Sequence, residues 1–428
     1  MDDRRRFRVA VGVIILAVAL RVVWLFVSGY PADIRMYECW ALRAGTEGVA
    51  HIYDYDGPSA TTGGEYGYYD YPPLYAYVLA PIGALDAHFR PEDVSPAFTG
   101  TPAMEAAVKI PPLLADLALA GLLFWCVGRF ALGPRSPWIV ATLFLANPAV
   151  FVDSSHWGQP DAIHAFLVLL AVVFVLCGRT SAGWIAMTLA CFMKPLALPF
   201  VPILALATLA RATPRATVRS GLAVIGTALV LFLPFLLERH FRSIVFRIVA
   251  DTDIEAHTTL NAHNLWWLVA RWQPSDVLIV GSVTATQIGL VLFGIAYALT
   301  AAVVWTRRER DDVWFEGLFV VALVFFFVST HLHENHLYAA IPFALLCARD
   351  RVRTLLAMGV GFVALLNMVL YDPWGEALLD RLGLSSITHV GAQGWEIHTA
   401  TIAIGCGNAL LCGALCVVAV ATLLRDNR

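Results

Sequence analysis

Apolar runs recur along the whole chain and are separated by polar connections. Most of these runs are as long as the segments that cross a bilayer as helices, roughly 20 residues. We expect membrane spans near 9–29, 108–128, 138–152, 161–177, 182–193, 196–210, 220–236, 279–305, 313–330, 336–348, 354–371 and 399–424. The pattern predicts an all-α polytopic membrane protein, in which one domain (1–428) forms a bundle of about 12 transmembrane helices.

Two long connections stand out between the expected spans, at 30–107 and 237–278. The first contains the segment 73–89, which is apolar but interrupted by prolines. We expect this segment to be a helix lying at the membrane interface. The composition agrees with a membrane protein, because 59% of the residues are hydrophobic and only 14% are charged. A soluble surface needs more polar side chains than that.

Arginine marks one side of the membrane. It occupies every second connection and both ends of the chain, at Arg4, Arg5, Arg6, Arg8, Arg129, Arg135, Arg179, Arg211, Arg215, Arg219, Arg307, Arg308, Arg310, Arg349, Arg351, Arg353, Arg425 and Arg428. Cytoplasmic loops carry such an excess of positive charge. We therefore expect both termini in the cytoplasm, a retained first span, and the long connections 30–107 and 237–278 as extracytoplasmic loops.

Polar and titratable residues gather in the opposite set of connections. They form six stretches, "PADIRMYECW" (31–40), "YYDYPPLYAY" (68–77), "VDSSHWGQPDAIH" (152–164), "FMKPLALP" (192–199), "DTDIEAHTTLNAHNLWW" (251–267) and "HLHENH" (331–336). Because these stretches alternate with the arginine-rich connections, they meet at one face of the membrane. The sequence predicts a single extracytoplasmic cavity at the lipid boundary.

Two of these stretches carry a candidate base and a candidate cation. Asp33 follows the first span closely, so its carboxylate could take a proton from a substrate hydroxyl; the alternative is an ordinary solvated loop acid. Lys194 is one of only two lysines, and Pro195 breaks the helix next to it. Its ammonium could pair with a phosphate, or it could reach out to the lipid headgroups.

The stretch 152–164 offers further polar groups at the start of a span. His156, Gln159 and Asp161 surround a Gly-Gln-Pro turn, and Asp161 lies one helical turn before His164. Asp161 has an equally good alternative role, because a carboxylate at a helix N-terminus can cap the free backbone N–H groups.

The histidines of 331–336 suggest zinc, but their spacing argues against a metalloprotease. That motif needs histidines four positions apart, whereas His333-Glu334 is followed by His336. Zinc in another geometry remains an alternative, and a divalent cation is a possible cofactor, although we assign no metal ligand. The favoured interpretation is a set of hydrogen-bond donors that faces an anionic headgroup, in a wall whose working residues are His333, Glu334 and His336.

These stretches resemble segments of the GT-C superfamily of membrane glycosyltransferases. "YDYPPLYAY" resembles the DYPPLTAY-type segment of the Alg-type glucosyltransferases of the endoplasmic reticulum, and "FVDSSHWGQPDAI" resembles, in diverged form, their HGHFQYN segment. "NAHNLWWL" is similar to their Ala-Asn-x-Trp region. "HLHENHLYAAIPF" is similar to their His-Glu-Lys motif and to the HERY-type motif of bacterial GT-C mannosyltransferases. The matches follow the family's order from residue 31 to 345.

The resemblance implies a GT-C fold and an inverting transfer of a hexose, mannose or glucose, from a polyprenyl-phosphate donor. The acceptor would be an extracytoplasmic glycan or glycolipid. Asp33 matches the family's catalytic carboxylate by position. The residues expected to bind donor or acceptor are Tyr37, Asp70, Tyr71, His156, Gln159, Asp161, Lys194, Asn261, Asn264, His333, Glu334 and His336.

One position departs from the family pattern. Asn335 stands where the glucosyltransferase motif has a lysine, so His333, His336 or Lys194 must supply the positive partner. The arginine-rich, lysine-poor composition indicates a prokaryotic plasma-membrane relative. Two other classes remain as alternatives. A transporter or flippase of lipid-linked sugars would carry charges deep inside spans and an internal repeat, and a metalloenzyme would use the histidines. The sequence has no aromatic-interleaved basic patch, which excludes nucleic acid as a partner.

Overall fold

The computed structural model describes residues 3–54, 68–132, 136–240, 244, 256–384, 388–390 and 396–425. Within these residues the chain is all-α apart from two short hairpins. Six helices are long and apolar enough to cross a membrane, which indicates an integral membrane protein. They are α1 (Asp3–Trp24), α4 (Pro102–Phe130), α10 (Pro214–Leu237), α13 (Ala285–Thr306), α16 (Arg351–Val369) and α18 (Thr399–Arg425).

The other predicted spans correspond to shorter apolar helices. They are α5 (Pro137–Leu145), α6 (Pro148–Phe151), α7 (Asp161–Leu176), α8 (Thr180–Met193), η5 (Pro195–Phe200), α9 (Val201–Arg211), α14 (Asp312–Val328) and α15 (Ala340–Cys347). Among the described residues, six helices could cross a membrane by length and composition, or seven if the bent pair at 137–156 is one span. A bundle of about 12 spans therefore stays a prediction.

Three predicted spans need correction, one at an internal break and two at their start. The span at 138–152 is broken, because Asn147 caps the next helix and Pro148 begins it, and the two halves meet at 53°. The span at 279–305 begins as a hairpin of β1 (Leu278–Val280) and β2 (Val283–Thr284), and α13 starts only at a capping box formed by Thr284 and Gln287. The span at 336–348 starts at Ala340, because the histidine stretch forms turns.

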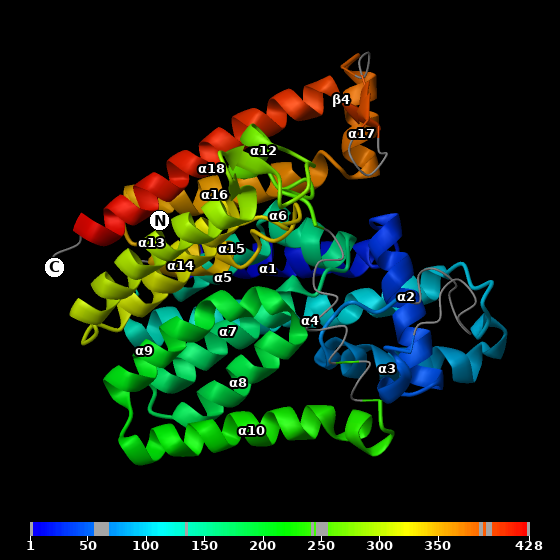
Figure 1. Ribbon diagram of the computed structural model, residues 1–428, viewed down its shortest axis with the longest axis horizontal. Helices are drawn as coiled ribbons and strands as arrows, with labels where there is room; N and C mark the ends of the chain where they lie inside the picture. Colours follow the sequence, from blue (N-terminus) through cyan, green and yellow to red (C-terminus); the bar gives the residue numbers. More distant parts are fainter. Residues whose placement is uncertain are drawn as a thin grey trace.

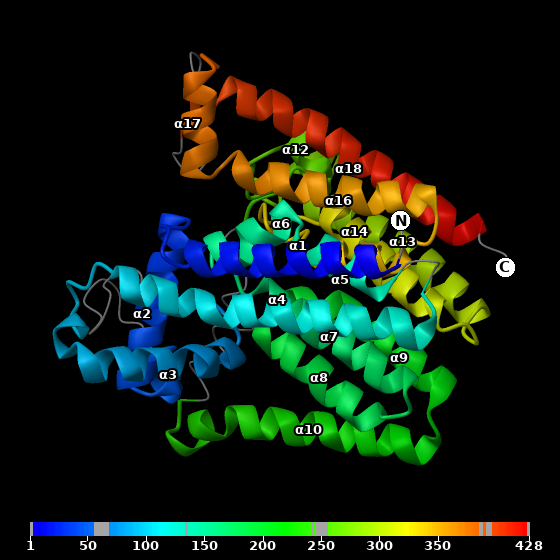
Figure 2. The same cartoon turned by 180° about the vertical axis from the view of Figure 1, so that it is seen from behind.

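The first long connection is more helical than we expected. Besides α3 (Pro73–Phe89), which is the helix predicted at 73–89, it contains α2 (Pro31–Thr46), η1 (Val49–His51) and η3 (Pro91–Asp93). Helices α2 and α3 cross closely because glycines lie at the crossing: a Cβ added to Gly83 would meet the carbonyl oxygen of Ala41 at 1.7 Å. The pair lies beside the outer end of α4 (Figures 1 and 2).

The remaining elements lie at the same end of the molecule as the α2–α3 pair. They are the π-helical turn η4 (Val152–His156), α12 (Leu265–Val269), α17 (Pro373–Arg381), and the hairpin of β3 (Thr388–Val390) and β4 (Glu396–His398). In both views α10 forms one edge of the bundle and α18 the opposite edge, with α7 and α14 between them. The largest apolar core joins these central helices, and a second core lies between α2, α3 and α4.

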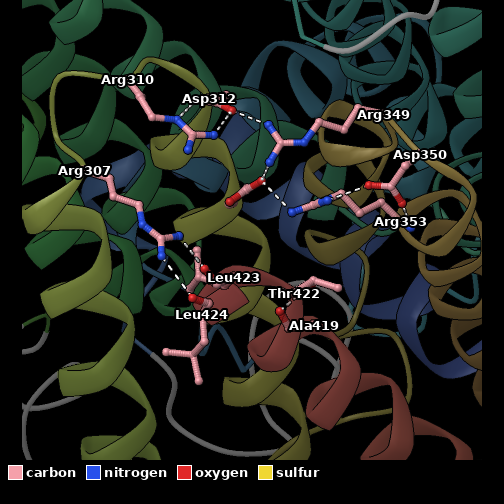
Figure 3. Close-up of polar contacts among 11 residues, drawn as sticks. Arg307, Arg310, Asp312, Arg349, Asp350, Arg353, Ala419, Thr422, Leu423 and Leu424 are labelled. Atoms are coloured by element: carbon pink, nitrogen blue, oxygen red, sulfur yellow. Dashed lines mark hydrogen bonds and ion pairs between the residues drawn. The ribbon is translucent and has the colours of Figure 1, made fainter. Parts of the chain in front are cut away.

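An ionic network fixes the end of α14 that lies away from the polar stretches (Figure 3). Arg349 pairs with Asp312 and, at 2.5 Å, with Glu316, while Arg310 also binds Asp312. Helix α14 spans 17 residues, which is about 25 Å of rise. The arginine-rich connections and the histidine stretch therefore lie at opposite ends of one helix, as a membrane-crossing arrangement requires.

Candidate functional site

Asp33 lies in the first turn of α2 and is half-buried. Its carboxylate accepts a hydrogen bond of 2.5 Å from Nε2 of Gln159. The other end of the same amide accepts a 2.8 Å hydrogen bond from the hydroxyl of Tyr37, one turn further along α2. Gln159 thus holds the predicted base against a second predicted site residue. The N-terminus of α2 also places the partial positive charge of its backbone N–H groups beside this carboxylate.

The local chain path explains why Gln159 reaches α2. Residues 152–156 form the π-helical turn η4, and Gly158 then adopts a φ of +72°, which reverses the chain before α7. The backbone N–H of Gln159 donates to the carbonyl of Asp153 at 3.0 Å. Because π-helical turns often occur at functional sites, this irregular turn is a structural reason to place the site here.

A buried ion pair forms the second part of the site. Nζ of Lys194, at the break between α8 and η5, lies 2.9 Å and 3.1 Å from the two carboxylate oxygens of Asp161. Nδ2 of Asn335 donates to the same carboxylate at 2.6 Å. Asp161 begins α7, yet its side chain makes no capping hydrogen bond, since Pro160 is the N-cap residue. Helix capping, the alternative role for Asp161, is therefore not the one that these contacts show, and Lys194 is the partner of its carboxylate.

Tyr71 connects the two parts. The Lys194 ammonium lies 5.7 Å from the centre of its ring, within the range of a cation–π contact. The same ring lies 6.4 Å from the ring of Tyr37. Its neighbour Asp70 is exposed. Residues from four of the six polar stretches, near 33, 71, 159 and 194, thus meet in one cluster, and Asn335 brings in the fifth.

Asp153 is a candidate that sequence reasoning missed. Its side chain is fully buried, and neither carboxylate oxygen has a hydrogen-bond partner among the described residues. It lies within electrostatic range of Asp161, Lys194 and Asp33. A buried, unpaired carboxylate is costly, so its presence beside the ion pair points to a functional environment. The available signal was a second acid in the stretch 152–164, directly before the chain reversal.

The histidine stretch packs beside the ion pair. The backbone N–H of His333 donates to Nδ1 of His336 at 3.1 Å, and the two rings lie 5.0 Å apart. Burial, followed by the nearby Lys194, lowers the pKa of His336 well below its usual value. His336 is therefore neutral near pH 7, and it can offer a hydrogen bond but no positive charge.

Glu334, from the histidine stretch 331–336, adds a second carboxylate near Asp33. Glu334 is buried, and its charge acts on Tyr30 together with that of Asp33. Burial raises the pKa of the Tyr30 hydroxyl well above its usual value, and these two carboxylates raise it further. Tyr30 therefore stays a neutral hydrogen-bond donor beside the predicted base.

His156 is held by partners that the sequence did not indicate. Its Nε2 lies 2.9 Å from Asp372, and its Nδ1 accepts a 3.2 Å hydrogen bond from the indole of Trp24. The indole of Trp157 donates to the same oxygen of Asp372 at 2.8 Å. Burial would raise the pKa of Asp372, but these hydrogen bonds outweigh it and lower the pKa below its usual value. These contacts link His156 to α1 and to the start of α17.

The two predicted asparagines serve the scaffold. Asn264 caps α12 by accepting the backbone N–H groups of Trp266 and Trp267, while its Nδ2 donates to backbone carbonyls of 326 and 329. Asn261 accepts the indole N–H of Trp272 at 2.9 Å and pairs with the backbone of His333. Both are buried. They hold the histidine stretch in place, and residues 251–255 of the same polar stretch lie outside the described residues.

The pH dependence of stability should report on Glu38, which is buried in α2 and accepts the N–H of Thr101 at 3.1 Å. Burial raises the pKa of this carboxyl from 4.5 to about 7, although the Thr101 N–H opposes the shift. Between these values the folded state keeps a proton that the unfolded state has released, so stability falls as pH rises.

The variant Glu38→Gln should therefore be more stable than wild type at pH 8, by about 3 kcal/mol, and nearly equal to it at pH 4.5. Thermal unfolding of both proteins in the same detergent at the two pH values measures this difference. A difference of the same size at both values would show that the Glu38 proton does not matter.

No family model matches the chain, and no curated protein matches it. The site residues provide a half-buried carboxylate that is hydrogen-bonded to Gln159, a buried lysine paired with Asp161, to which Asn335 also donates, and neutral donors such as His336 and Tyr30. This set combines a proton acceptor with groups that can bind an anion.

Proposed function

We propose that the protein is a GT-C-type membrane glycosyltransferase that moves a hexose from a polyprenyl-phosphate donor to an extracytoplasmic glycan or glycolipid. Mannose and glucose are the sugars that the sequence resemblance favours. The observation that carries the proposal is the cluster in which Asp33, held by Gln159, lies in the same polar assembly as the Lys194–Asp161 pair. A base and an anion-binding group are what such a transfer needs.

The reaction is a single displacement with inversion. Asp33 takes the proton of the acceptor hydroxyl while the acceptor oxygen forms a bond to the anomeric carbon of the sugar. The bond between that carbon and the phosphate oxygen breaks, and its electron pair leaves with the polyprenyl phosphate. The base and the leaving group must then lie on opposite faces of the sugar. This requirement is consistent with separate positions for Asp33 on α2 and Lys194 at the end of α8.

Lys194 is the group that best replaces the missing lysine of the family motif. Asn335, which occupies the motif position, donates to Asp161, and the Lys194 ammonium binds that same carboxylate. Lys194, at the end of α8, therefore places its positive charge at the same carboxylate that Asn335 contacts. The donor phosphate would compete with Asp161 for this ammonium, while His333, His336 and Glu334 complete the wall beside it. Charge placed where the leaving group develops charge stabilises the transition state.

The orientation in the membrane follows from the charge pattern. The arginine-rich connections would face the cytoplasm, and the candidate site at the other end of α14 would face outward, in a prokaryotic plasma membrane. The lipid tail of the donor would lie between helices at the bilayer boundary. Such a site takes its donor from the membrane and its acceptor from the outer surface.

A vesicle experiment separates this proposal from the flippase alternative. Purified protein is reconstituted in vesicles with polyprenyl-phosphate mannose or glucose and an acceptor glycolipid, and both free polyprenyl phosphate and donor translocation are measured. The proposal predicts release of polyprenyl phosphate that depends on the acceptor, and no faster translocation than in empty vesicles. Rapid translocation without any release would overturn it in favour of a flippase.

A further inference from the structure

A second cluster of titratable side chains lies away from the site described above, where the segment after α2 meets the end of α10. His51, Asp54 and His240 each present one ligand atom, and these atoms lie within 4.8 Å of one another. Nδ1 of His51 lies 3.1 Å from Asp54, and Nδ1 of His240 lies 2.8 Å from the same carboxylate oxygen. Two imidazoles thus point the same ring nitrogen at one carboxylate.

These distances resemble those between the ligands of a small divalent cation. Zinc binds histidine nitrogen and carboxylate oxygen at about 2.0–2.2 Å, so the ligand atoms of a tetrahedral site lie roughly 3.3 Å apart. The observed separations of 3.1 Å and 2.8 Å are slightly shorter. A cation would replace the protons that the two Nδ1 atoms otherwise share with Asp54. Two imidazoles and one carboxylate suit zinc and its transition-metal neighbours better than calcium or magnesium.

The backbone that carries two of these ligands is fixed by a buried arginine. Arg43 in α2 is only 2% exposed, and its Nη2 donates to the carbonyls of His51 at 3.2 Å and Asp54 at 3.0 Å. The side chain of Arg43 therefore fixes the backbone of both ligand residues to α2. Metal-binding loops are often preorganised in this way, because ligands that are already ordered lose less conformational entropy when the metal binds.

The third ligand is placed by the end of α10. Arg239 adopts a left-handed φ of +62°, and the N–H of His240 then donates to the carbonyl of Phe235 at 2.9 Å. This is a Schellman cap, which normally uses glycine at the left-handed position. The ring of Phe235 packs 5.7 Å from that of Tyr53, so α10 and the ligand segment are already joined by apolar contact.

A carboxylate also lies beyond one of the imidazoles. Oε2 of Glu238 is 3.9 Å from Nε2 of His51, on the ring nitrogen that does not face Asp54. Histidines that bind metals usually donate this second N–H to a carboxylate, which orients the ring and raises its basicity. The cluster remains reachable from water, because the side chains of His51, Asp54 and His240 are 39%, 28% and 28% exposed.

We propose that His51, Asp54 and His240 form a binding site for one divalent transition-metal ion of the zinc class, with water completing the coordination. The ion ties the outer end of α10 to the helical unit formed by α2 and α3. The site is separate from Asp33 and Lys194, and it does not depend on the proposed sugar transfer. Its function is to fasten the extracytoplasmic unit to the bundle.

Zinc binding by the full-length protein tests this proposal. The protein is purified with a tag that contains no histidine, treated with a chelator, and titrated with zinc by equilibrium dialysis with metal analysis. Wild type should bind one zinc tightly. Removing a residue that only hydrogen-bonds to a zinc ligand typically weakens zinc binding by about 10–100-fold. His51→Ala and His240→Ala each remove a ligand itself, so they should weaken binding by about 100-fold or more. The exposed outer histidine His88 provides the matched control, and His88→Ala should bind as wild type does.

A second readout guards against misfolded variants. Zinc should raise the unfolding temperature of wild type and of His88→Ala, whereas that of Asp54→Asn should not respond. Without zinc, all variants should unfold cooperatively. The proposal is overturned if wild type binds no zinc, if His51→Ala and His240→Ala bind it as well as wild type, or if His333→Ala alone removes the binding.

Discussion

The variant Asp33→Asn should lose about 10³-fold in the rate of sugar transfer while remaining folded. General-base catalysis contributes about 10²–10⁴-fold in enzymes, and an asparagine cannot accept the acceptor's proton. Its amide oxygen can still accept the hydrogen bond that Gln159 donates to Asp33. The hydrogen bonds through Gln159 to Tyr37 are therefore kept. The variant should have a lower transfer rate but the same stability as wild type. The measurement is the initial rate of polyprenyl-phosphate release in the presence of the acceptor.

An exposed acid on the same side of the molecule provides the control for this variant. Glu92, in the short helix η3 between α3 and α4, is exposed. Glu92→Gln removes one negative charge from the same helical segment between α1 and α4, but it should leave the transfer rate unchanged. Wild-type activity in Asp33→Asn would remove Asp33 from the role of base, whatever the result for Glu92→Gln.

Replacing Lys194 should have the largest effect on stability. In Lys194→Met the Asp161 carboxylate loses its ammonium and is left buried, with the amide of Asn335 as its hydrogen-bond donor and Nδ1 of His164 at 3.4 Å. Breaking a buried ion pair by removing one partner costs about 3–5 kcal/mol. We expect a correspondingly lower unfolding temperature in detergent, and no measurable transfer activity.

A double variant separates the structural role of Lys194 from its role at the donor. Lys194→Met combined with Asp161→Asn removes both charges, and Asn335 can still donate to the new amide. Stability should recover most of the loss, because no uncompensated buried charge remains. Activity should not recover, since no ammonium is left for the donor phosphate. Recovery of both properties would show that the pair only holds the helices together.

The apolar pattern predicts most of the fold because burial in lipid or core acts on long stretches of sequence. Helix α10 (Pro214–Leu237) covers the span expected at 220–236, and α18 (Thr399–Arg425) covers that expected at 399–424. The break at Asn147 was missed because the run on both sides is apolar, and hydropathy averages over it. Helix α2 was missed because it is stabilised mainly by packing on α3, and its own sequence is not strongly apolar.

The candidate site shows where sequence reasoning reaches its limit. The stretches that would contribute could be named in advance, because sidedness follows from the arginine pattern. The residues that pair with each other inside the site could not be named from the sequence. Asp161 was weighed as a local helix cap, whereas it pairs with a lysine 33 residues away, and Asp372 reaches His156 from 216 residues away. Which side chains satisfy a buried charge is decided by tertiary packing, and local sequence carries no information about it.

The most direct test of the proposed function is the fate of the donor. The purified protein is incubated with an acceptor glycolipid and a panel of polyprenyl-phosphate sugars, and the products are analysed by mass spectrometry and by the anomeric configuration of the new bond. We predict that one hexose donor is consumed, that free polyprenyl phosphate appears in equal amount, and that the transferred sugar has the inverted configuration. Consumption of no donor, or transfer with retention, would contradict the account.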